Sequence, residues 1–215
     1  MNTLILDCSA GMNIFLLKKD EEFKLIDTNQ KRHTDTLLVS VNQLLEDAKM
    51  TIKEIDNICV CVGPGSFTGI RVAVSMAKGL SIGIGAKVFA CSNFDIYSFG
   101  ECEKSIYILD GFSDFVYVRI FDGKTSTDSC EHIGNFITKI KTDYADYKIY
   151  VQSEKVQNLL KNDEIVSNLV QNKTILCFKD KIERGEDINI SSICPIYLRA
   201  SQAEIERNKK LNGEN

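Results

Sequence analysis

The feature that most constrains this chain is a buried strand that passes through a glycine-proline turn into a long apolar helix. Residues Ile58–Val62 form a continuous apolar run, which is typical of a strand buried on both faces of a sheet. The sequence Gly63-Pro64-Gly65 ends that strand. Apolar residues then recur at helical spacing from Ser66 to Ile84. This order of elements indicates an α/β fold.

The predicted helix is apolar around most of its circumference. Its apolar arc covers roughly 220°, against about 100° for a helix on the surface of a globular protein. Two interpretations stay open. The helix is enclosed by its own domain, or it lays one face on a sheet and the other on a partner. The partner interpretation gives these candidate interface residues, several of them small: Gly69, Val72, Ala73, Met76, Leu80 and Gly83.

The turn before this helix is a second candidate site. Free backbone N–H groups at a helix start can hold an anion, which makes Gly63, Gly65 and Ser66 candidate anion-binding residues. The phosphate-loop motif fails because its Lys is missing, and the dinucleotide motif fails because Thr68 stands where it needs Gly. The alternative is a tight turn in which Ser66 caps the helix.

Apolar patterning predicts further elements in the first half of the chain. The predicted strands are Thr3–Leu6, Met12–Leu17, Phe23–Asp27 and Lys87–Ala90. The predicted helices are residues 35–49 and Asn93–Phe99. The buried face of the first of these helices is predicted to consist of Leu37, Leu38, Val41, Leu44, Leu45 and Ala48.

The order of elements then restarts, which indicates a duplication. Both Ile5-Leu6-Asp7 and Ile108-Leu109-Asp110 end a strand that leads into a hairpin. The second half continues with a predicted strand at Phe115–Phe121, a helix at Ile133–Ile140 and a strand at Lys148–Val151. We therefore predict a first lobe over residues 1–102, a second, degenerate lobe over 103–198, and a C-terminal helix with a charged tail over 199–215.

Composition narrows the class of protein. The 26 Lys and Arg against 30 Asp and Glu give a net charge of −4. This charge argues against a chain that binds nucleic acid without a partner protein. No secretory signal and no membrane span are expected, so a cytoplasmic location is predicted. The eight cysteines contain no C-x-x-C motif and are accompanied only by His33 and His132. Free thiols and no metal site are therefore expected.

Four sequence motifs resemble one known family. The string from Gly63 to Arg71, Gly-Pro-Gly-Ser-Phe-Thr-Gly-Ile-Arg, resembles the signature of the bacterial TsaB (YeaZ) family. Asp7-Cys8-Ser9 resembles the family's Asp-Thr-Ser start, with Cys8 in place of Thr. His33 resembles the His that opens the first helix there, and 195–199 resembles the C-terminal Pro-x-Tyr-Leu-Arg. The resemblance covers the whole chain.

The resemblance implies a fold and a role. The fold is the duplicated actin/sugar-kinase/Hsp70-like (ASKHA) fold, with two ribonuclease-H-like lobes. The role is that of a non-catalytic assembly subunit in making N6-threonylcarbamoyladenosine beside the anticodon of tRNAs that read A-starting codons. The implied partners are the catalytic paralogue TsaD and the TsaE ATPase, with tRNA reached only through the complex. Interface residues on the first helix are Thr36, Ser40 and Gln43.

The same resemblance sets limits on chemistry. TsaD carries a His-x-x-x-His pair after the long helix, whereas residues 90–96 here contain no His, so no metal centre is expected. ATP or ADP is expected only within the complex, no membrane partner is expected, and a homodimer through the same helices stays open. Arg71 is interpreted either as solvated or as facing tRNA phosphates or a partner's acids.

Two alternative functions are weighed against the assembly role. One is a stand-alone ATP-dependent small-molecule kinase of the same fold, with Asp7 and Asp110 as its acids; the sequence shows no adenosine-binding glycine loop. The other is a hydrolase that uses Ser66, Cys61 or Cys91; no motif places a histidine base beside any of them.

Overall fold

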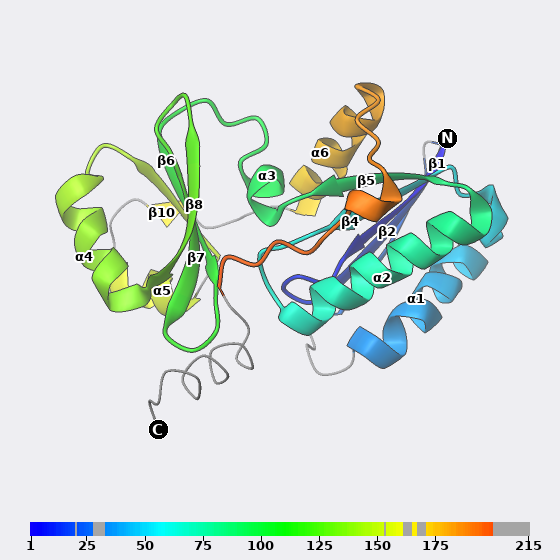
Figure 1. Cartoon of the computed structure of the whole chain (residues 1–215), viewed down its shortest axis with the longest axis horizontal. Helices are drawn as coiled ribbons and strands as arrows, with labels where there is room; N and C mark the ends of the chain where they lie inside the picture. The colour runs from blue at the N-terminus through cyan, green and yellow to red at the C-terminus, as the bar shows by residue number, and fades with distance from the viewer. Residues whose placement is uncertain (20, 28–32, 153, 161–164, 167–170, 200–215) are drawn as a thin grey trace.

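The chain forms two lobes, each built on a five-stranded sheet, in the computed structural model (Figure 1). The structure describes residues 1–19, 21–27, 33–152, 154–160, 165–166 and 171–199. The strand order is β3-β2-β1-β4-β5 in the first sheet and β10-β9-β6-β7-β8 in the second. The two orders correspond strand for strand, which confirms the duplicated ASKHA-like fold.

The first sheet joins an antiparallel meander to two parallel strands. Strands β1 (Asn2–Asp7), β2 (Met12–Lys18) and β3 (Glu21–Asp27) pair antiparallel. Strands β4 (Asn57–Cys61) and β5 (Lys87–Cys91) run parallel to β1. All five residues of β4 are buried, as its continuous apolar pattern predicts.

Helices α1 (His33–Asp47) and α2 (Phe67–Ile84) lie side by side over one face of this sheet (Figure 1). A short 3-10 helix, η1 (Ile52–Glu54), precedes β4. The predicted buried face of α1 is confirmed except at Leu38, which is 53% exposed. Leu38 lies 100° around the helix from the buried Leu37 and so turns away from the sheet.

Helix α2 is a core helix of this lobe. It is long and apolar enough to cross a membrane by length and composition, and it is the one such helix in the described part of the chain. Its sheet-facing side, however, contributes Ile70, Ala73, Val74 and Ala77 to the core that it shares with β1 and β4. This side of α2 is therefore enclosed by its own lobe, as the first of the two interpretations of the wide apolar arc predicts.

The opposite face of the first sheet is covered by α3 (Asn93–Tyr97) and α6 (Gln171–Glu183). Phe89 from β5, Phe94 from α3 and Phe178 from α6 share a second core cluster. Helix α6 falls in the range predicted for the second lobe, yet it contacts α3 and β5 of the first lobe. The chain therefore returns to the first lobe after it has built the second.

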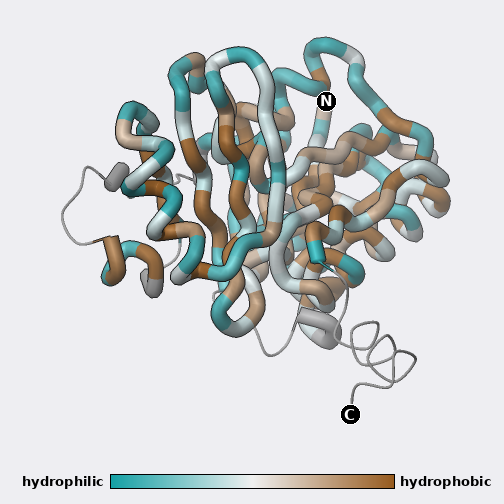
Figure 2. Tube along the Cα trace, turned by 60° about the vertical axis from the view of Figure 1, so that its left-hand side comes forward, coloured by the Kyte–Doolittle hydropathy of each residue, from teal (hydrophilic) through white to brown (hydrophobic). Residues whose placement is uncertain are grey.

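The second sheet repeats the pattern with shorter elements. Its strands are β6 (Ser105–Asp110), β7 (Phe115–Phe121), β8 (Ser126–His132), β9 (Lys148–Val151) and β10 (Ile165–Val166). Its helices are α4 (Ile133–Asp143) and α5 (Glu154–Leu160). Figure 2 shows hydrophobic residues along the middle of the strands and hydrophilic residues at the hairpin tips. A third core cluster lies within this lobe.

The C-terminal segment connects the lobes. After the 3-10 helix η2 (Ile190–Ser192), Ile193 enters the first core. The N–H of Ile196 donates to the carbonyl oxygen of Val62 at 2.8 Å. Arg199 then places its guanidinium 4.0 Å from the ring centroid of Phe115 in the second lobe. The predicted helix beyond Arg199 lies outside the described residues.

Candidate functional site

Exposed apolar side chains on α1 and α2 form the first candidate site. Leu38 and Val39 on α1 are largely exposed. Val72, Met76 and Leu80 on α2 pack against the core with one side and stay half-buried. We call these five residues the helix-pair face. An apolar surface of this kind is a common mark of a protein–protein interface.

The structure exposes some of the residues predicted for the α2 interface and buries others. Val72, Met76 and Leu80 are half-buried and Gly83 is exposed, so these four are available to a partner. Ala73 is fully buried, because it lies on the sheet-facing arc. Gly69 is buried as well. It lies so close to the carbonyl oxygen of Cys8 that a Cβ at this position would collide with it. Ala73 and Gly69 therefore serve the packing of the chain itself, a correction to the predicted set.

The three interface residues predicted on α1 also differ in exposure. Gln43 is exposed, and its amide donates to Asp47 Oδ1 at 3.0 Å. Thr36 is half-buried, and its hydroxyl lies 3.9 Å from the sulfur of Met12. Ser40 is buried, which removes it from the predicted interface, because it lies on the edge of the α1 face that packs on the lobe. The side chain of His33 lies outside the described residues.

The turn before α2 closes on itself. The N–H of Ser66 donates to the carbonyl oxygen of Ser9 at 2.6 Å. The Ser66 hydroxyl accepts from the N–H of Gly69 at 3.2 Å, which confirms the predicted helix cap. Gly63 has a positive φ of 98°, and a Cβ there would lie 2.7 Å from Ile70 Cδ1. The N–H of Ser66, one of the three predicted anion-binding residues, is thus used internally, as is the N–H of Gly69 at the helix start, which favours the turn-and-cap interpretation.

A buried polar cluster fixes this turn to the first strand. Asp7 Oδ1 accepts hydrogen bonds from the N–H and the hydroxyl of Ser9, at 2.9 and 2.5 Å. Asn93 donates from its amide nitrogen to the carbonyl oxygen of Pro64 at 2.6 Å and accepts from the Cys61 thiol at 2.9 Å. Burial raises the pKa of Asp7. Asp7 is therefore a structural carboxyl inside the lobe.

Arg71 is bound to the C-terminal segment. Its Nε donates to the hydroxyl of Tyr197 at 2.7 Å, and its guanidinium lies 3.7 Å from the ring centroid of Phe67. The rings of Phe67 and Tyr197 are themselves 4.7 Å apart. The sequence interpretations, free solvation or contact with another molecule, missed this intramolecular role. Two motifs that stand apart in the sequence are thereby joined in one contact.

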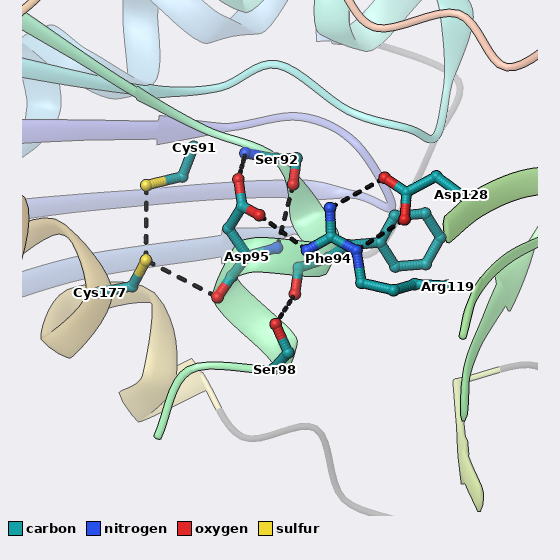
Figure 3. A network of polar contacts seen from close by, with 8 residues as sticks. All are labelled: Cys91, Ser92, Phe94, Asp95, Ser98, Arg119, Asp128 and Cys177. Atoms are coloured by element: carbon teal, nitrogen blue, oxygen red, sulfur yellow. Dashed lines mark hydrogen bonds and ion pairs between the residues drawn. The ribbon is translucent and has the colours of Figure 1, made fainter. Parts of the chain in front are cut away.

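A network of hydrogen bonds and ion pairs lies at the junction of the lobes (Figure 3). Like the contact of Arg71 with Tyr197, it was not predicted from the sequence. Arg119 in β7 donates through Nη1 to Asp95 in α3 at 2.7 Å. It also donates through Nε and Nη2 to Asp128 in β8, at 2.7 and 2.8 Å. Burial alone would raise the pKa of Asp95, but the bonds from Arg119 and Ser92 outweigh it and hold the pKa below its ordinary value.

The side chains that could bind a metal are spread across the described ranges. Within them, no three His, Cys, Asp or Glu side chains are grouped so that they could hold a metal ion. All eight cysteines are free thiols, five of them buried: Cys8, Cys59, Cys61, Cys91 and Cys177.

Comparisons with known proteins now add to this geometry. Residues 26–119 match the model of the family described as "TsaD: tRNA N6-adenosine threonylcarbamoyltransferase". The chain is 31% identical to the protein named tRNA threonylcarbamoyladenosine biosynthesis protein TsaB from Buchnera aphidicola, over 45% of this chain and 44% of that one. It is 27% identical to the protein of the same name from Haemophilus influenzae, over 54% and 52%. The chain thus spans about half the length of these curated relatives.

Further comparisons cover nearly the whole chain. The Bacillus subtilis protein of the same name is 23% identical over 95% of this chain and 96% of its own. The solved structure titled "YeaZ from Pseudomonas aeruginosa" is similar with a TM-score of 0.73 and 19% identity, over 92% of this chain and 99% of that one. A second Pseudomonas aeruginosa structure, described as similar to peptidase YEAZ, gives a TM-score of 0.74 at 21% identity over the same shares. The structural likeness shows the shared fold, and the sequence matches show that the chain is similar to proteins of the TsaB/YeaZ family.

Proposed function

We propose that this chain is a non-catalytic accessory subunit in the synthesis of tRNA threonylcarbamoyladenosine, and that it binds a TsaD-family partner through the helix-pair face. The relatives are named for that biosynthesis, which supports the pathway. The observation that carries the binding role is the exposure of apolar side chains on two adjacent helices. The cytoplasm, where tRNA is modified, is the proposed location.

Burial of these side chains supplies a driving force for association. Each square ångström of apolar surface removed from water contributes about 25 cal/mol. Leu38 and Val39 on α1 leave more than half of their surface in water, so a partner that covers them would gain this contribution. Val72, Met76 and Leu80 are already held against the core, so a partner would meet ordered side chains. Two helices packed side by side on the partner protein could cover such a surface.

The buried state of Asp7 weighs against the stand-alone kinase. A kinase of this fold needs an ionised carboxylate at a phosphate-binding cleft, whereas Asp7 is enclosed and bonded to Ser9. Its counterpart Asp110 is exposed at the end of β6. We therefore propose that ATP or ADP is handled only in the complex, which would include the TsaE ATPase, and that tRNA is reached through the partner.

Analytical ultracentrifugation of the full chain with the TsaD-family protein of the same source tests this proposal. We expect a heterodimer, and we expect Leu38→Glu and Met76→Glu to weaken it at least tenfold. Leu159→Glu is the matched control, because Leu159 on α5 is 51% exposed, close to the 53% of Leu38, but lies in the second lobe. Its affinity should equal that of the unaltered chain.

Sedimentation of the chain alone separates the remaining possibilities. A homodimer that Leu38→Glu dissolves would show that the same face also pairs with itself. If the chain does not bind the TsaD-family protein, or if Leu159→Glu weakens binding as much as Leu38→Glu, the proposed interface is wrong. ATP turnover by the chain alone, abolished by Asp7→Asn, would support the kinase instead.

A further inference from the structure

Two cysteines from distant parts of the chain face each other beneath α6. Cys91 ends β5 and Cys177 lies in α6, and their sulfur atoms are 3.4 Å apart (Figure 3). Their residues are only 2% and 3% exposed. A disulfide has an S–S distance of about 2.05 Å, so a closure of roughly 1.4 Å would join the two sulfurs. A small shift of one helix side chain supplies a movement of that size.

The surroundings make the two thiols unequal. The hydrogen bond with Cys91 lowers the pKa of Cys177, against the opposing effect of burial. Lys181 lowers it further, while the carboxylates of Asp95 and Asp180 raise it. The same hydrogen bond, followed by burial, raises the pKa of Cys91. Cys177 is therefore the thiol that more readily becomes the thiolate, the form that reacts with oxidants.

We propose that Cys91 and Cys177 form a dithiol redox site that hydrogen peroxide converts into a disulfide. The Cys177 thiolate attacks one peroxide oxygen and breaks the O–O bond, which gives a sulfenic acid and hydroxide; the hydroxide takes up the proton released by Cys177 and becomes water. The Cys91 sulfur then attacks the Cys177 sulfur and breaks its S–O bond. The departing hydroxide leaves with the Cys91 proton as a second water. Two electrons pass from the thiols to the peroxide.

The position of this pair gives the bond a structural consequence. Every strand of the second sheet, from β6 to β10, lies in the chain between the two cysteines. The disulfide would therefore close a covalent loop that contains the second lobe and would pin α6 to β5. Cross-links that close long loops restrict the unfolded chain most, so the oxidised form is the more stable one. A thiol reductant would reverse the change.

Peptide mapping of the full chain tests this site. Exposed Cys102 and Cys194 are first replaced by Ser, which leaves one cysteine in the tryptic peptide 88–104. The protein is treated with hydrogen peroxide at low concentration, its remaining thiols are alkylated, and it is digested without reductant. We expect peptide 88–104 linked to peptide 174–179, and the link should vanish with dithiothreitol. The unfolding midpoint should rise by several degrees on oxidation.

Control variants and alternative products decide the assignment. Cys91→Ser should remove both the linked peptide and the rise in midpoint, whereas Cys130→Ser, in the second lobe, should change neither. A link from Cys177 to peptide 54–71 would overturn the assignment, because that peptide contains Cys59 and Cys61, which lie in the same core cluster. Irreversible oxidation of either thiol without a linked peptide would also overturn it. The mapping itself needs no change in the core, so a folding defect in Cys91→Ser leaves the proposal testable.

Discussion

Asp95 and Arg119 form an ion pair across the junction of the two lobes, with Oδ1 and Nη1 2.7 Å apart. Asp95 lies in α3 of the first lobe and Arg119 in β7 of the second. The arginine side chain is 13% exposed, and its other two nitrogen atoms donate to Asp128 in β8. One guanidinium thus fixes a helix of one lobe against a hairpin of the other.

Replacement of this arginine should therefore cost stability. Arg119→Met leaves two partly exposed carboxylates without their hydrogen-bonding cation, and we expect the free energy of unfolding to fall by about 1–3 kcal/mol. Arg184→Met is the control, since its ion pair with Asp180 is at the surface of α6 and should change stability by less than about 0.5 kcal/mol. Urea denaturation measures both. Equal losses of free energy of unfolding in the two variants would mean that the ion pair at the junction contributes no more than a surface ion pair.

Two glycines of α2 should respond in opposite ways to alanine. Gly69→Ala forces a Cβ against the carbonyl oxygen of Cys8, so we expect a loss of about 1–3 kcal/mol. Gly79 has open space around it, so Gly79→Ala should raise stability by about 0.5–1 kcal/mol through better helix propensity. Thermal unfolding of the two variants, side by side, checks the pair of signs. A stable Gly69→Ala would show that the α2 start can move away from β1.

The buried carboxyl of Asp7 should make stability depend on pH. Its pKa is raised in the folded state, so the folded protein retains this proton where the unfolded chain has lost it. This contribution is therefore full below the ordinary carboxyl pKa and is lost as the pH rises through the raised value. Asp7→Asn should remove the dependence, because its side-chain oxygen can still accept from Ser9.

Urea titrations of both proteins from acid to neutral pH test this sign. The stability of the unaltered chain relative to Asp7→Asn should fall as the pH rises. Subtraction of one protein from the other removes the opposite contribution of Asp95, whose lowered pKa adds stability that is lost toward acid pH. A difference that grows with pH would show that Asp7 is stabilised as the carboxylate.

The attachment of α6 to the first lobe should also be measurable. Phe178 is fully buried in the core between α6 and the first sheet, so Phe178→Ala should cost about 3–5 kcal/mol. Its neighbour Leu176 is half exposed, and Leu176→Ala should cost less than about 1 kcal/mol. Hydrogen exchange of β5 amides, compared between the variants, would show whether the loss is felt in the first sheet. Protection unchanged in Phe178→Ala would contradict the packing of α6 on β5.

Local patterns made the first lobe predictable. The continuous apolar run of β4, the helical spacing in α1 and the Ser66 cap each depend on a few neighbouring residues, and the structure confirms them. The polar edge strand β8, Ser126–His132, was not predicted, since its residues show no alternation of apolar and polar types. Helix α6 was missed as well, although its apolar residues Ile175, Phe178 and Ile182 recur at helical spacing.

The site was predictable only in part, for a related reason. The α2 residues that face outward were found by periodicity, but periodicity could not tell which flank the sheet would cover, so Ala73 was assigned to the wrong side. The bond between Arg71 and Tyr197 joins residues 126 positions apart. The pairing of Arg119 with Asp95 likewise depends on how two lobes meet. Contacts of this kind follow from the tertiary structure and leave no local trace in the sequence.

The late return of the chain to its first lobe has a consequence for protein synthesis. The first sheet can pair its strands as soon as β5 has left the ribosome, yet Phe89 and Phe94 lack the cover of Phe178 until residues 171–183 are made. At about 5–20 residues per second, this interval lasts several seconds. For that time the nascent chain presents an aromatic, cysteine-rich surface to the cell, and a chaperone that shields it would act before α6 exists.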